Sequence, residues 1–304
     1  MDDVIIVNRF PVWDDEFDAK KWNTKFLETN VILNSDVYEA VYPIHWGPLS
    51  LKFAFNGSEY YEASNCRYRV TDGKFLLFNQ DQLYSSSVIS DSAVRSFTLN
   101  FCPEFKKKKF AELMASELKL LDDPEYEPIN ELNFFSKLYS YDPDIAKEIF
   151  ELKNYIDGLN YNSLYINEKM SNILEGIYKL NCSVLKETEG VAGGKAATRI
   201  ETYKRISRAK DYIESNFMNA VSLETLGKVS SMNQFHFLRK FKQFYKKTPH
   251  QYLTEVRLRE AKAFLKKKKY SVTEVCMEVG FEDPASFSKL FKRSFGVSPV
   301  DYRN

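Results

Sequence analysis

The chain has 304 residues, 44% of them hydrophobic and 28% charged, which is enough for two or three domains that each bury a core. No run approaches the roughly 18 consecutive apolar residues of a membrane span, and the opening MDDVIIVNRF is acidic where a secretory signal would be basic. The four cysteines form no CxxC pair, which argues against zinc fingers and redox motifs. We therefore expect a soluble, cytoplasmic protein with reduced thiols.

Charge is distributed unevenly along the chain. The 43 basic and 42 acidic residues give a net charge of only +1. Residues 195–304 nevertheless hold 23 basic and 11 acidic residues, whereas the first 194 residues hold 20 and 31. A basic part joined to an acidic part is typical of a nucleic-acid-binding domain attached to a separate domain. Neutralisation of phosphates would give the basic part affinity for any DNA sequence.

Residues 1–127 predict a domain of antiparallel strands. Short runs rich in Val, Ile, Phe, Tyr and Leu alternate with Gly, Pro, Asn and Asp, as in LSLKFAFNGSEYYE and VRSFTLNF, which is the pattern of hairpins. Several aromatic side chains could line a pocket or simply form the core, so no ligand-binding residue is assigned among Trp46, Phe53, Phe55, Tyr60, Phe78 and Tyr84.

Residues 128–187 predict a helical segment. Two apolar stripes have the spacing i, i+4, i+7 and i+11 of one helix face: Ile145, Ile149, Leu152 and Ile156, then Ile166, Met170, Ile173 and Ile177. Asp157 and Gly158 separate the stripes, so we expect an antiparallel helix pair. The stripes could cover the preceding strands or pair with a second copy of the chain, and the pattern favours neither.

A Gly- and Ala-rich segment follows, and we place a flexible linker at residues 188–198. Its Gly-Gly-Lys is not a phosphate-binding loop, because Glu189 stands at the position of the first glycine and Ala196 at that of the Ser or Thr. From Ile200 a basic helix opens a helical domain at residues 199–304. The expected buried stripe of that helix is Tyr203, Ile206, Ala209, Ile213 and Phe217.

A motif occurs twice within this domain, at Ser222–Tyr252 and at Ser271–Tyr302. The offset between the copies is 49 before the turn and 50 after it, so the second copy has one extra turn residue. Matched positions are Leu226, Met232, Phe237, Phe241, Pro249 and Tyr252 with Val275, Phe281, Phe287, Phe291, Pro299 and Tyr302. Each copy has the layout of a helix-turn-helix. Two units predict a protein that reads two major-groove segments of double-stranded DNA.

The second helix of each copy has an apolar and a basic face. At about 100° per residue, the inward stripes are Phe237, Phe241 and Phe244, and Phe287, Phe291 and Ser294. The opposite faces would meet DNA: Phe235, Leu238, Arg239 and Lys242, and Ala285, Ser288, Lys289 and Lys292. Such faces also suit an ordinary core and a solvated surface, but the paired copies favour DNA. Expected N-caps are Ser222, Asn233, Ser271 and Asp283.

These residues resemble the DNA-binding domain of AraC/XylS-type transcription regulators. The resemblance covers about the last hundred residues and rests on GFEDPASFSKLFKRSFGVSPVDYR, Gly280–Arg303, and on the linker-helix sequence Thr248–Leu265, in which Arg257 matches an Arg that the family keeps. It implies that bases are read by Gln234, Phe235, Leu238, Arg239, Pro284, Ala285, Ser286 and Lys289. Candidate phosphate contacts are Ser222, Asn233, Lys242, Lys247, Ser271, Lys292 and Arg293.

The chain departs from the family pattern at a few positions. Gly227 and Cys276 stand where each supporting helix usually has Ala, and Lys246 stands where the first recognition helix usually ends in Gly. We expect Gly227 to destabilise the first unit by about 1 kcal/mol. Because residues 284–286 are small, the second helix should read thymine methyl groups or backbone, and the first unit should carry more of the specificity.

The resemblance extends to the N-terminal region, where residues 57–79 are similar to the cupin-like β-barrel sensor of many AraC-type proteins. It implies an α+β chain: an antiparallel cupin-like barrel (1–127), a helical dimerisation or cover segment (128–187), and two helix-turn-helix units joined by a linker helix (199–304). Cupin enzymes usually bind a metal through several His and a carboxylate. His45 is the only histidine of this region, so we expect no catalytic residue, cofactor or metal site.

The expected function is that of a nucleoid-associated transcription regulator, an activator by family analogy. Its expected partners are promoter DNA, RNA polymerase, a second copy of the chain and an unknown small-molecule effector, and no membrane. One alternative is a regulator without a small ligand, controlled by its abundance or by a partner protein. A more distant alternative is a cupin enzyme with a DNA-binding appendage.

Overall fold

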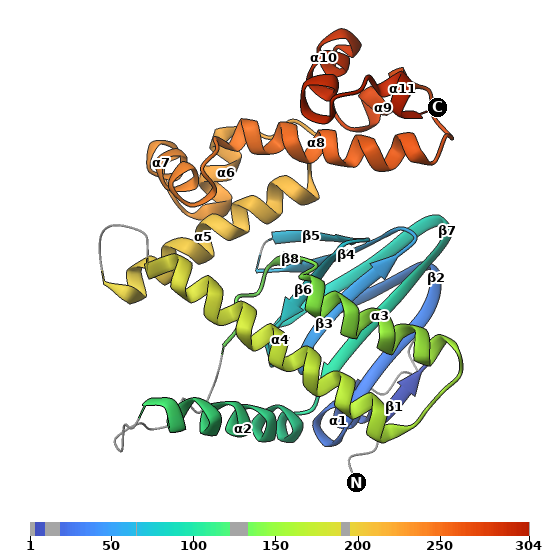
Figure 1. The fold of residues 1–304 in the computed structure, drawn as a ribbon, viewed down its shortest axis with the longest axis vertical. Coiled ribbons are helices and arrows are strands. Elements are labelled where there is room, and N and C mark those ends of the chain that lie inside the picture. Colours follow the sequence, from blue (N-terminus) through green and yellow to red (C-terminus); the bar gives the residue numbers. More distant parts are fainter. Residues whose placement is uncertain (1–3, 10–18, 65, 122–132, 190–194, 304) are drawn as a thin grey trace. The chain divides into compact units, whose positions relative to one another are not determined.

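The computed structural model describes residues 4–9, 19–64, 66–121, 133–189 and 195–303. The chain divides into two compact units, Met1–Gly190 and Val191–Asn304, which run from blue to yellow-green and from yellow to red in Figure 1. The first unit is built around a sheet and the second is helical. This confirms the predicted α+β class.

One sheet of eight strands forms the centre of the first unit in the described part of the chain. The strands are β1 (Val4–Val7), β2 (Asn30–Trp46), β3 (Leu49–Phe55), β4 (Ser58–Ala63), β5 (Cys66–Thr71), β6 (Lys74–Phe78), β7 (Leu83–Phe101) and β8 (Leu138–Ser140). Their order is β1-β2-β7-β3-β6-β8, and β4 pairs with both β5 and β7. Neighbours are antiparallel, as the hairpin pattern predicts, except that β1 is parallel to β2.

The long strand β7 gives the sheet two different faces. Its C-terminal half pairs with β2 and β3, and its N-terminal half pairs with β2 and β4. Because side chains alternate along a strand and the register is known, Ser96, Thr98 and Asn100 share one face with Ser50, Lys52 and Ala54. The other face carries Leu51, Phe53, Phe55, Phe97, Leu99 and Phe101.

Helices cover the phenylalanine-rich face. α3 (Pro143–Asp157) and α4 (Ser163–Glu189) lie across the same side of the sheet in Figure 1, and the ring of Phe150 on α3 is 5.9 Å from that of Phe55. All eight residues of the two predicted stripes are buried, so the expected helix pair on either side of Asp157 is confirmed. Two further helices, α1 (Ala19–Glu28) and α2 (Pro103–Leu121), lie in the region predicted as strands.

Two expected boundaries differ from the structure. The helical segment predicted from residue 128 contains strand β8, which pairs with β6, because three residues are too few to show a periodic pattern. The predicted linker at 188–198 is helical at both ends, since α4 continues to Glu189 and α5 begins at Ala196 rather than at Ile200. The intervening residues 190–194 lie outside the described residues.

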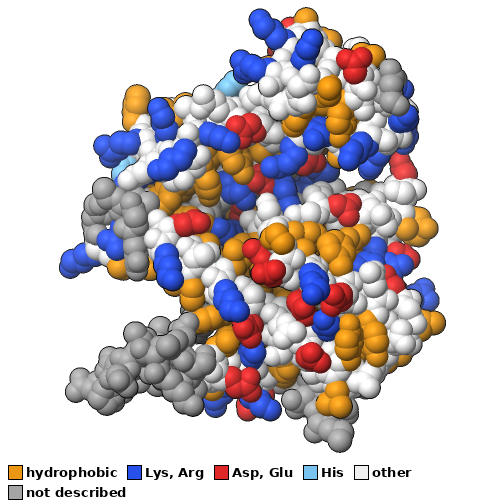
Figure 2. All heavy atoms as spheres, viewed as in Figure 1, with side chains coloured by type: hydrophobic (Ala, Val, Ile, Leu, Met, Phe, Trp, Pro, Cys, Tyr) orange, Lys and Arg blue, Asp and Glu red, His pale blue; other side chains and the backbone are white. Residues whose placement is uncertain are grey.

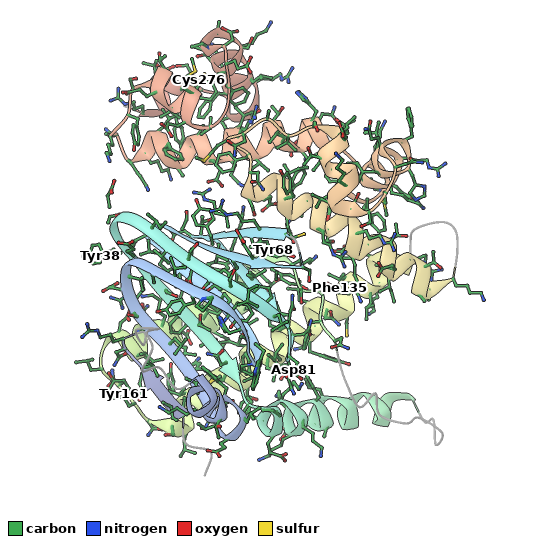
Figure 3. The ribbon with its side chains drawn as sticks, turned by 180° about the vertical axis from the view of Figure 1, so that it is seen from behind. Tyr38, Tyr68, Asp81, Phe135, Tyr161 and Cys276 are labelled. Carbon is green, nitrogen blue, oxygen red and sulfur yellow. The ribbon has the colours of Figure 1, made fainter. Side chains whose placement is uncertain are left out.

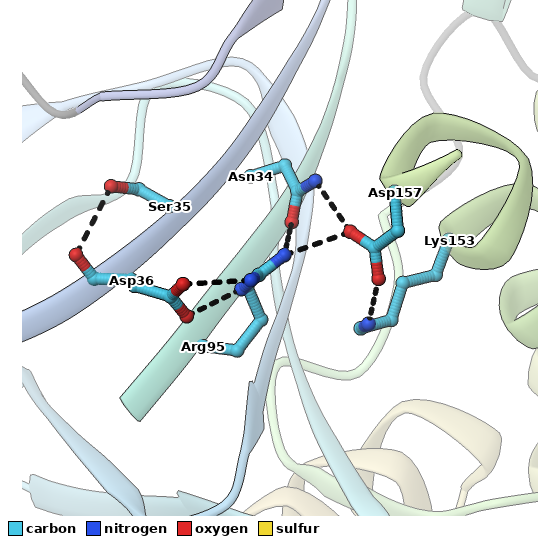
Figure 4. Close-up of polar contacts among 6 residues, drawn as sticks. All are labelled: Asn34, Ser35, Asp36, Arg95, Lys153 and Asp157. Carbon is cyan, nitrogen blue, oxygen red and sulfur yellow. Dashed lines mark hydrogen bonds and ion pairs between the residues drawn. The ribbon is translucent and has the colours of Figure 1, made fainter. Parts of the chain in front are cut away.

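A charged cluster ties the end of α3 to the sheet (Figure 4). Arg95 of β7 donates to both carboxylate oxygens of Asp36 on β2, at 2.6 and 2.7 Å, and to Asp157 at 2.8 Å. Asn34 donates to the same Asp157 oxygen at 2.9 Å, and Lys153 donates to the other. Burial would raise the pKa of Asp157, but the hydrogen bonds from Lys153 and Asn34 and the nearby positive charges lower it. The cluster therefore fixes where α3 ends over β2 and β7.

The second unit contains seven helices in its described residues: α5 (Ala196–Ser215), α6 (Leu223–Ser230), α7 (Gln234–Tyr245), α8 (Pro249–Lys266), α9 (Val272–Glu278), α10 (Pro284–Phe295) and α11 (Pro299–Arg303). They share one core, in which four of the five residues of the predicted stripe pack with Phe237, Phe241, Phe287 and Phe291: Ile206, Ala209, Ile213 and Phe217. Beside this core, Lys210 is within 3.2 Å of both Asp211 and Glu214. Tyr252 of α8 donates to Glu214. The buried charged side chains of α5 therefore interact with partners inside the second unit.

Candidate nucleic-acid interface

The first helix-turn-helix consists of α6 and α7. Ser222 Oγ accepts from the backbone N–H of Thr225 and caps α6, and Asn233 Oδ1 accepts from that of His236 and caps α7. Between the helices, Ser231 adopts the left-handed conformation with φ 52°, and Met232 N–H donates to the Gly227 carbonyl at 2.9 Å. Both predicted caps are confirmed.

The second helix-turn-helix consists of α9 and α10. Ser271 and Glu274 form a reciprocal capping box at the start of α9, and Asp283 accepts from the N–H groups of Ala285 and Ser286 at the start of α10. Gly280, at φ 85°, takes the place of Ser231 in the turn. The extra turn residue of this copy is Glu282, which lies between Phe281 and the capping aspartate.

Gly227 and Cys276 hold equivalent positions beneath the two turns, and Figure 3 labels Cys276 within its helical unit. Phe281 N–H donates to the Cys276 carbonyl at 3.0 Å, which repeats the bond between Met232 and Gly227. A Cβ on Gly227 would lie 2.9 Å from the Met232 carbonyl oxygen. In the second helix-turn-helix there is room for the Cys276 side chain beneath the turn, and its thiol donates to the Phe281 carbonyl at 3.6 Å. The first turn is thus closer to its supporting helix, and glycine allows that approach.

The inward stripes of α7 and α10 are as expected except at one position. Phe237, Phe241, Phe287 and Phe291 are fully buried. Ser294, predicted to pack inward, is exposed, and Phe295 packs instead, with its ring 4.7 Å from that of Phe291. At about 100° per residue, Phe295 lies only about 40° from Phe291 around the helix, whereas Ser294 lies about 60° away.

The linker helix α8 joins the two helix-turn-helix motifs. It begins with a capping box between Thr248 and Gln251 and with Pro249 in its first turn. Midway along it, Arg257 donates to the carbonyl oxygens of Phe217 at 2.7 Å and Asn219 at 3.0 Å, in the segment between α5 and α6. Burial lowers the pKa of Arg257. In the sequence, only the resemblance to the family points to Arg257, and its partners cannot be predicted because they lie about 40 residues away.

Most residues predicted to read bases lie on the solvent side of α7 and α10. Phe235 is 86% exposed, which is unusual for an aromatic side chain. Arg239 and Lys289 are also exposed, and a guanidinium nitrogen of Arg239 lies 3.4 Å from His236 Nδ1. The remaining candidates are exposed at Gln234, Ala285 and Ser286 and partly exposed at Leu238 and Pro284.

The candidate phosphate contacts fall into two groups. Ser222, Asn233 and Ser271 use their side-chain oxygens as helix caps, and Lys247 is paired with Glu255 at 2.6 Å. The other group consists of Lys242, Lys292 and Arg293, which are exposed and form no ion pair among the described residues. Figure 2 shows basic side chains over α7, α8 and α10. The unpaired group is the better suited to bind phosphates.

Within the described residues, no helix is long and apolar enough to cross a membrane. No group of three or more His, Cys, Asp or Glu side chains in the described ranges is arranged to hold a metal ion.

Comparisons with known proteins concern mainly the second unit. Residues 226–304 match a family model described as a helix-turn-helix domain. An uncharacterized HTH-type transcriptional regulator of Haemophilus influenzae is 35% identical over 100 residues, 33% of this chain and 34% of that protein. The lactose operon transcription activator of Staphylococcus xylosus is 25% identical over 178 residues, 57% of this chain and 63% of that protein. The HTH-type transcriptional activator RhaS of an Enterobacter species is 35% identical over 99 residues, 33% and 36% of the two chains.

The chain thus spans between a third and just under two thirds of the length of these curated relatives. Among solved structures, ToxT of Vibrio cholerae is 13% identical, with 90% of this chain and 96% of that chain covered and a TM-score of 0.37. The DNA-binding domain of AdpA in complex with a target DNA is 28% identical, with 33% and 89% covered and a TM-score of 0.31. The relatives are named as regulators, in agreement with the expectation that the chain is not an enzyme. The C-terminal part of this chain is a helix-turn-helix domain of the AraC/XylS family.

Proposed function

We propose that this chain is a transcription activator whose two helix-turn-helix units bind adjacent major-groove segments of promoter DNA, about 10 bp apart on one face of the duplex. The observation that carries the proposal is that α7 and α10 each have an exposed basic face. Arg239, Lys242, Lys289, Lys292 and Arg293 extend from these two helices without an ion pair to any described residue. Unpaired cations on the solvent side of two recognition helices suit a polyanion, and the activators among the relatives support the direction of regulation.

Two kinds of contact should be separable in this interface. A guanidinium can donate two hydrogen bonds to the edge of a guanine, whereas a lysine at the groove wall neutralises a phosphate of any sequence. We assign the first role to Arg239, in the middle of α7, and the second to Lys242, one turn later. Phe235, Leu238 and Gln234 would provide further contacts from α7, and Pro284, Ala285, Ser286 and Lys289 would provide those from α10.

The test compares Arg239→Ala with Lys242→Ala in binding assays against a preferred DNA fragment and its single-base variants. Arg239→Ala should weaken binding to the preferred fragment by about 1–3 kcal/mol and relax the preference at one base position. Lys242→Ala should weaken binding to all fragments alike and reduce the salt dependence by about one phosphate. If the Arg239 variant kept the wild-type preference and affinity, the role of α7 as a reading helix would be wrong.

The first unit would supply regulation. We propose that it is a cupin-like sensor that binds a small effector or pairs with a second copy, so that ligand and DNA binding are coupled. The helical pair α3 and α4 and the sheet that it covers support this assignment. A regulator without a small ligand remains the second candidate, in which abundance or a partner protein sets activity. A ligand screen that never shifts the melting temperature would favour that candidate.

A further inference from the structure

A lysine is buried inside the first unit. Lys52, in the middle of β3, is only 4% exposed and lies on the sheet face opposite the helix pair, beside Thr98 of β7 and Leu76 of β6. Lysine side chains are almost never fully buried unless they are paired. The role of this charge is therefore not explained by the packing of the sheet.

The partners of Lys52 are aromatic rather than acidic. Its ammonium group donates to the Tyr84 hydroxyl at 2.9 Å and lies 4.7 Å from the centre of the Tyr84 ring and 5.9 Å from that of Tyr61. An ammonium has three donors, and this is its one hydrogen bond within the described residues. No described carboxylate forms an ion pair with it.

The nearest candidate counter-ion has other partners. Glu59 of β4 is buried and accepts from Ser96 Oγ at 2.7 Å and from the Tyr61 hydroxyl. Glu59 lies near enough for the charge of Lys52 to lower its pKa, but burial raises that pKa more. Within the described residues, its carboxylate hydrogen-bonds to Ser96 and Tyr61 and forms no ion pair with Lys52.

A second polar atom on the same face is also unsatisfied. Ser50 precedes Lys52 by two residues on β3, which places the two on one face about 7 Å apart. Ser50 is fully buried, and its hydroxyl has no hydrogen-bond partner among the described residues. Buried hydroxyls are normally hydrogen-bonded. Ser50 and Lys52 are two residues apart on one face of β3, and both have donors without an acceptor among the described residues. This indicates a bound group that accepts hydrogen bonds from both.

We propose that Lys52, Ser50 and Tyr84 bind the anionic group, a carboxylate or a phosphate ester, of a small molecule held inside the first unit. The ammonium and the Ser50 hydroxyl would each donate to an anionic oxygen. Tyr84 would donate its own hydroxyl proton, because its oxygen already accepts from Lys52. Charge-assisted hydrogen bonds of this kind are short and strong in a buried setting. This inference rests on the proposed sensing role of the first unit.

The site lies close to the surface at one end. The half-buried His45 of β2 lies beside Tyr84, with ring centroids 4.4 Å apart. Burial and the nearby charge of Lys52 lower the pKa of His45 to about 4, against an opposing hydrogen bond to the Pro43 carbonyl. The His45 imidazole is therefore neutral at neutral pH, so the positive charge beside Tyr84 is that of Lys52.

The test uses the full chain and its melting temperature. The probes are butyrate and glycerol 3-phosphate, each compared with its neutral counterpart, butyramide or glycerol, at matched ionic strength. Lys52→Met removes the charge and keeps the length of the side chain. Lys74→Met is the matched control, because Lys74 is also buried, at 8% exposure, and lies on the same face of the sheet.

We expect one of the anionic probes to raise the melting temperature of wild type and of Lys74→Met by a few degrees. Neither neutral probe should do so, and Lys52→Met should not respond. Which of the two anions acts decides between a carboxylate and a phosphate. The proposal is overturned if neither anionic probe shifts the wild type, as it would if ordered water fills the site, or if the shift persists in Lys52→Met. The assay contains no DNA, so its failure leaves the DNA-binding proposal standing.

Discussion

The guanidinium of Arg257 donates from Nε to the carbonyl oxygen of Phe217 at 2.7 Å, and this bond joins the linker helix to the entrance of the first helix-turn-helix. The same side chain lies next to the turn of the second helix-turn-helix, between α9 and α10. A Cβ on Gly280 would lie 2.9 Å from an Arg257 nitrogen and 2.8 Å from the Met218 carbonyl oxygen. Arg257 of α8 thus lies against the segment before the first helix-turn-helix and against the turn of the second.

Loss of this side chain should destabilise the second unit. In Arg257→Met the carbonyls of Phe217 and Asn219 lose their donors, and we expect a loss of about 1–3 kcal/mol. The measurement is urea unfolding followed by far-ultraviolet circular dichroism. Arg259→Met is the control, because Arg259 lies two residues along the same helix and is exposed. Equal effects of the two substitutions would show that the hydrogen bonds of Arg257 to Phe217 and Asn219 do not contribute to the free energy of unfolding.

Gly280 should be far less tolerant of a side chain than Gly296. Both have positive φ, 85° and 80°, so Ala should cost about 1–2 kcal/mol at either position from backbone strain alone. At Gly280 the added Cβ also meets backbone and guanidinium atoms, whereas at Gly296 no atom of the described residues lies within 4 Å of the added Cβ. Gly280→Ala should therefore lower the melting temperature clearly more than Gly296→Ala. A Gly296 variant as unstable as the Gly280 variant would refute the close approach.

The end of α7 should gain stability from a glycine. Lys246 ends this helix at φ 58°, where the equivalent residue of α10 is Gly296. Lys246→Gly relieves the left-handed strain of a side-chain-bearing residue, and we expect a gain of about 0.5–1 kcal/mol. Lys240→Gly, in the interior of the same helix, should instead lose about 1 kcal/mol. Thermal unfolding of both variants tests this, and a lower stability of Lys246→Gly than of wild type would contradict the left-handed conformation of Lys246.

Asp157 should make stability depend on pH below the ordinary aspartate range. Its pKa is lower in the folded chain than in the unfolded chain, near 3.9. The stabilisation is therefore fully present above about pH 3.9 and is lost as the pH falls through the folded value. Since the side chain is 30% exposed, Asp157→Asn should cost only about 1 kcal/mol at pH 7.

Unfolding measured between pH 7 and pH 3 checks this dependence. The difference between wild type and Asp157→Asn should shrink as the pH falls below about 3.9. Asp91→Asn, at an exposed position of β7, should match wild type throughout. A difference that stays constant with pH would mean that the charge of Asp157 is not what holds α3 to the sheet.

The sequence predicts local features of this chain well and long-range ones poorly. The caps at Asn233 and Asp283 and the phenylalanine stripes follow from spacing within one helix, so they could be read directly. The contacts of Arg257 could not, because its partners are about 40 residues away. Lys52 is a similar case: in LSLKFAF it alternates with apolar residues, and that pattern predicts a solvent-facing lysine. Its burial results from strands β4 and β7, which no local pattern reveals.

The most direct test of the DNA-binding account is selection of genomic fragments by the purified chain at about physiological salt, where nonspecific binding is weak. If both helices read DNA, the selected fragments should share a motif with two short blocks about one helical turn apart, one for each of α7 and α10. Selection should lose the first block in Arg239→Ala and keep the second. Recovery of random fragments, or of a motif with a single block that Arg239→Ala leaves unchanged, would contradict two reading units held at a fixed spacing.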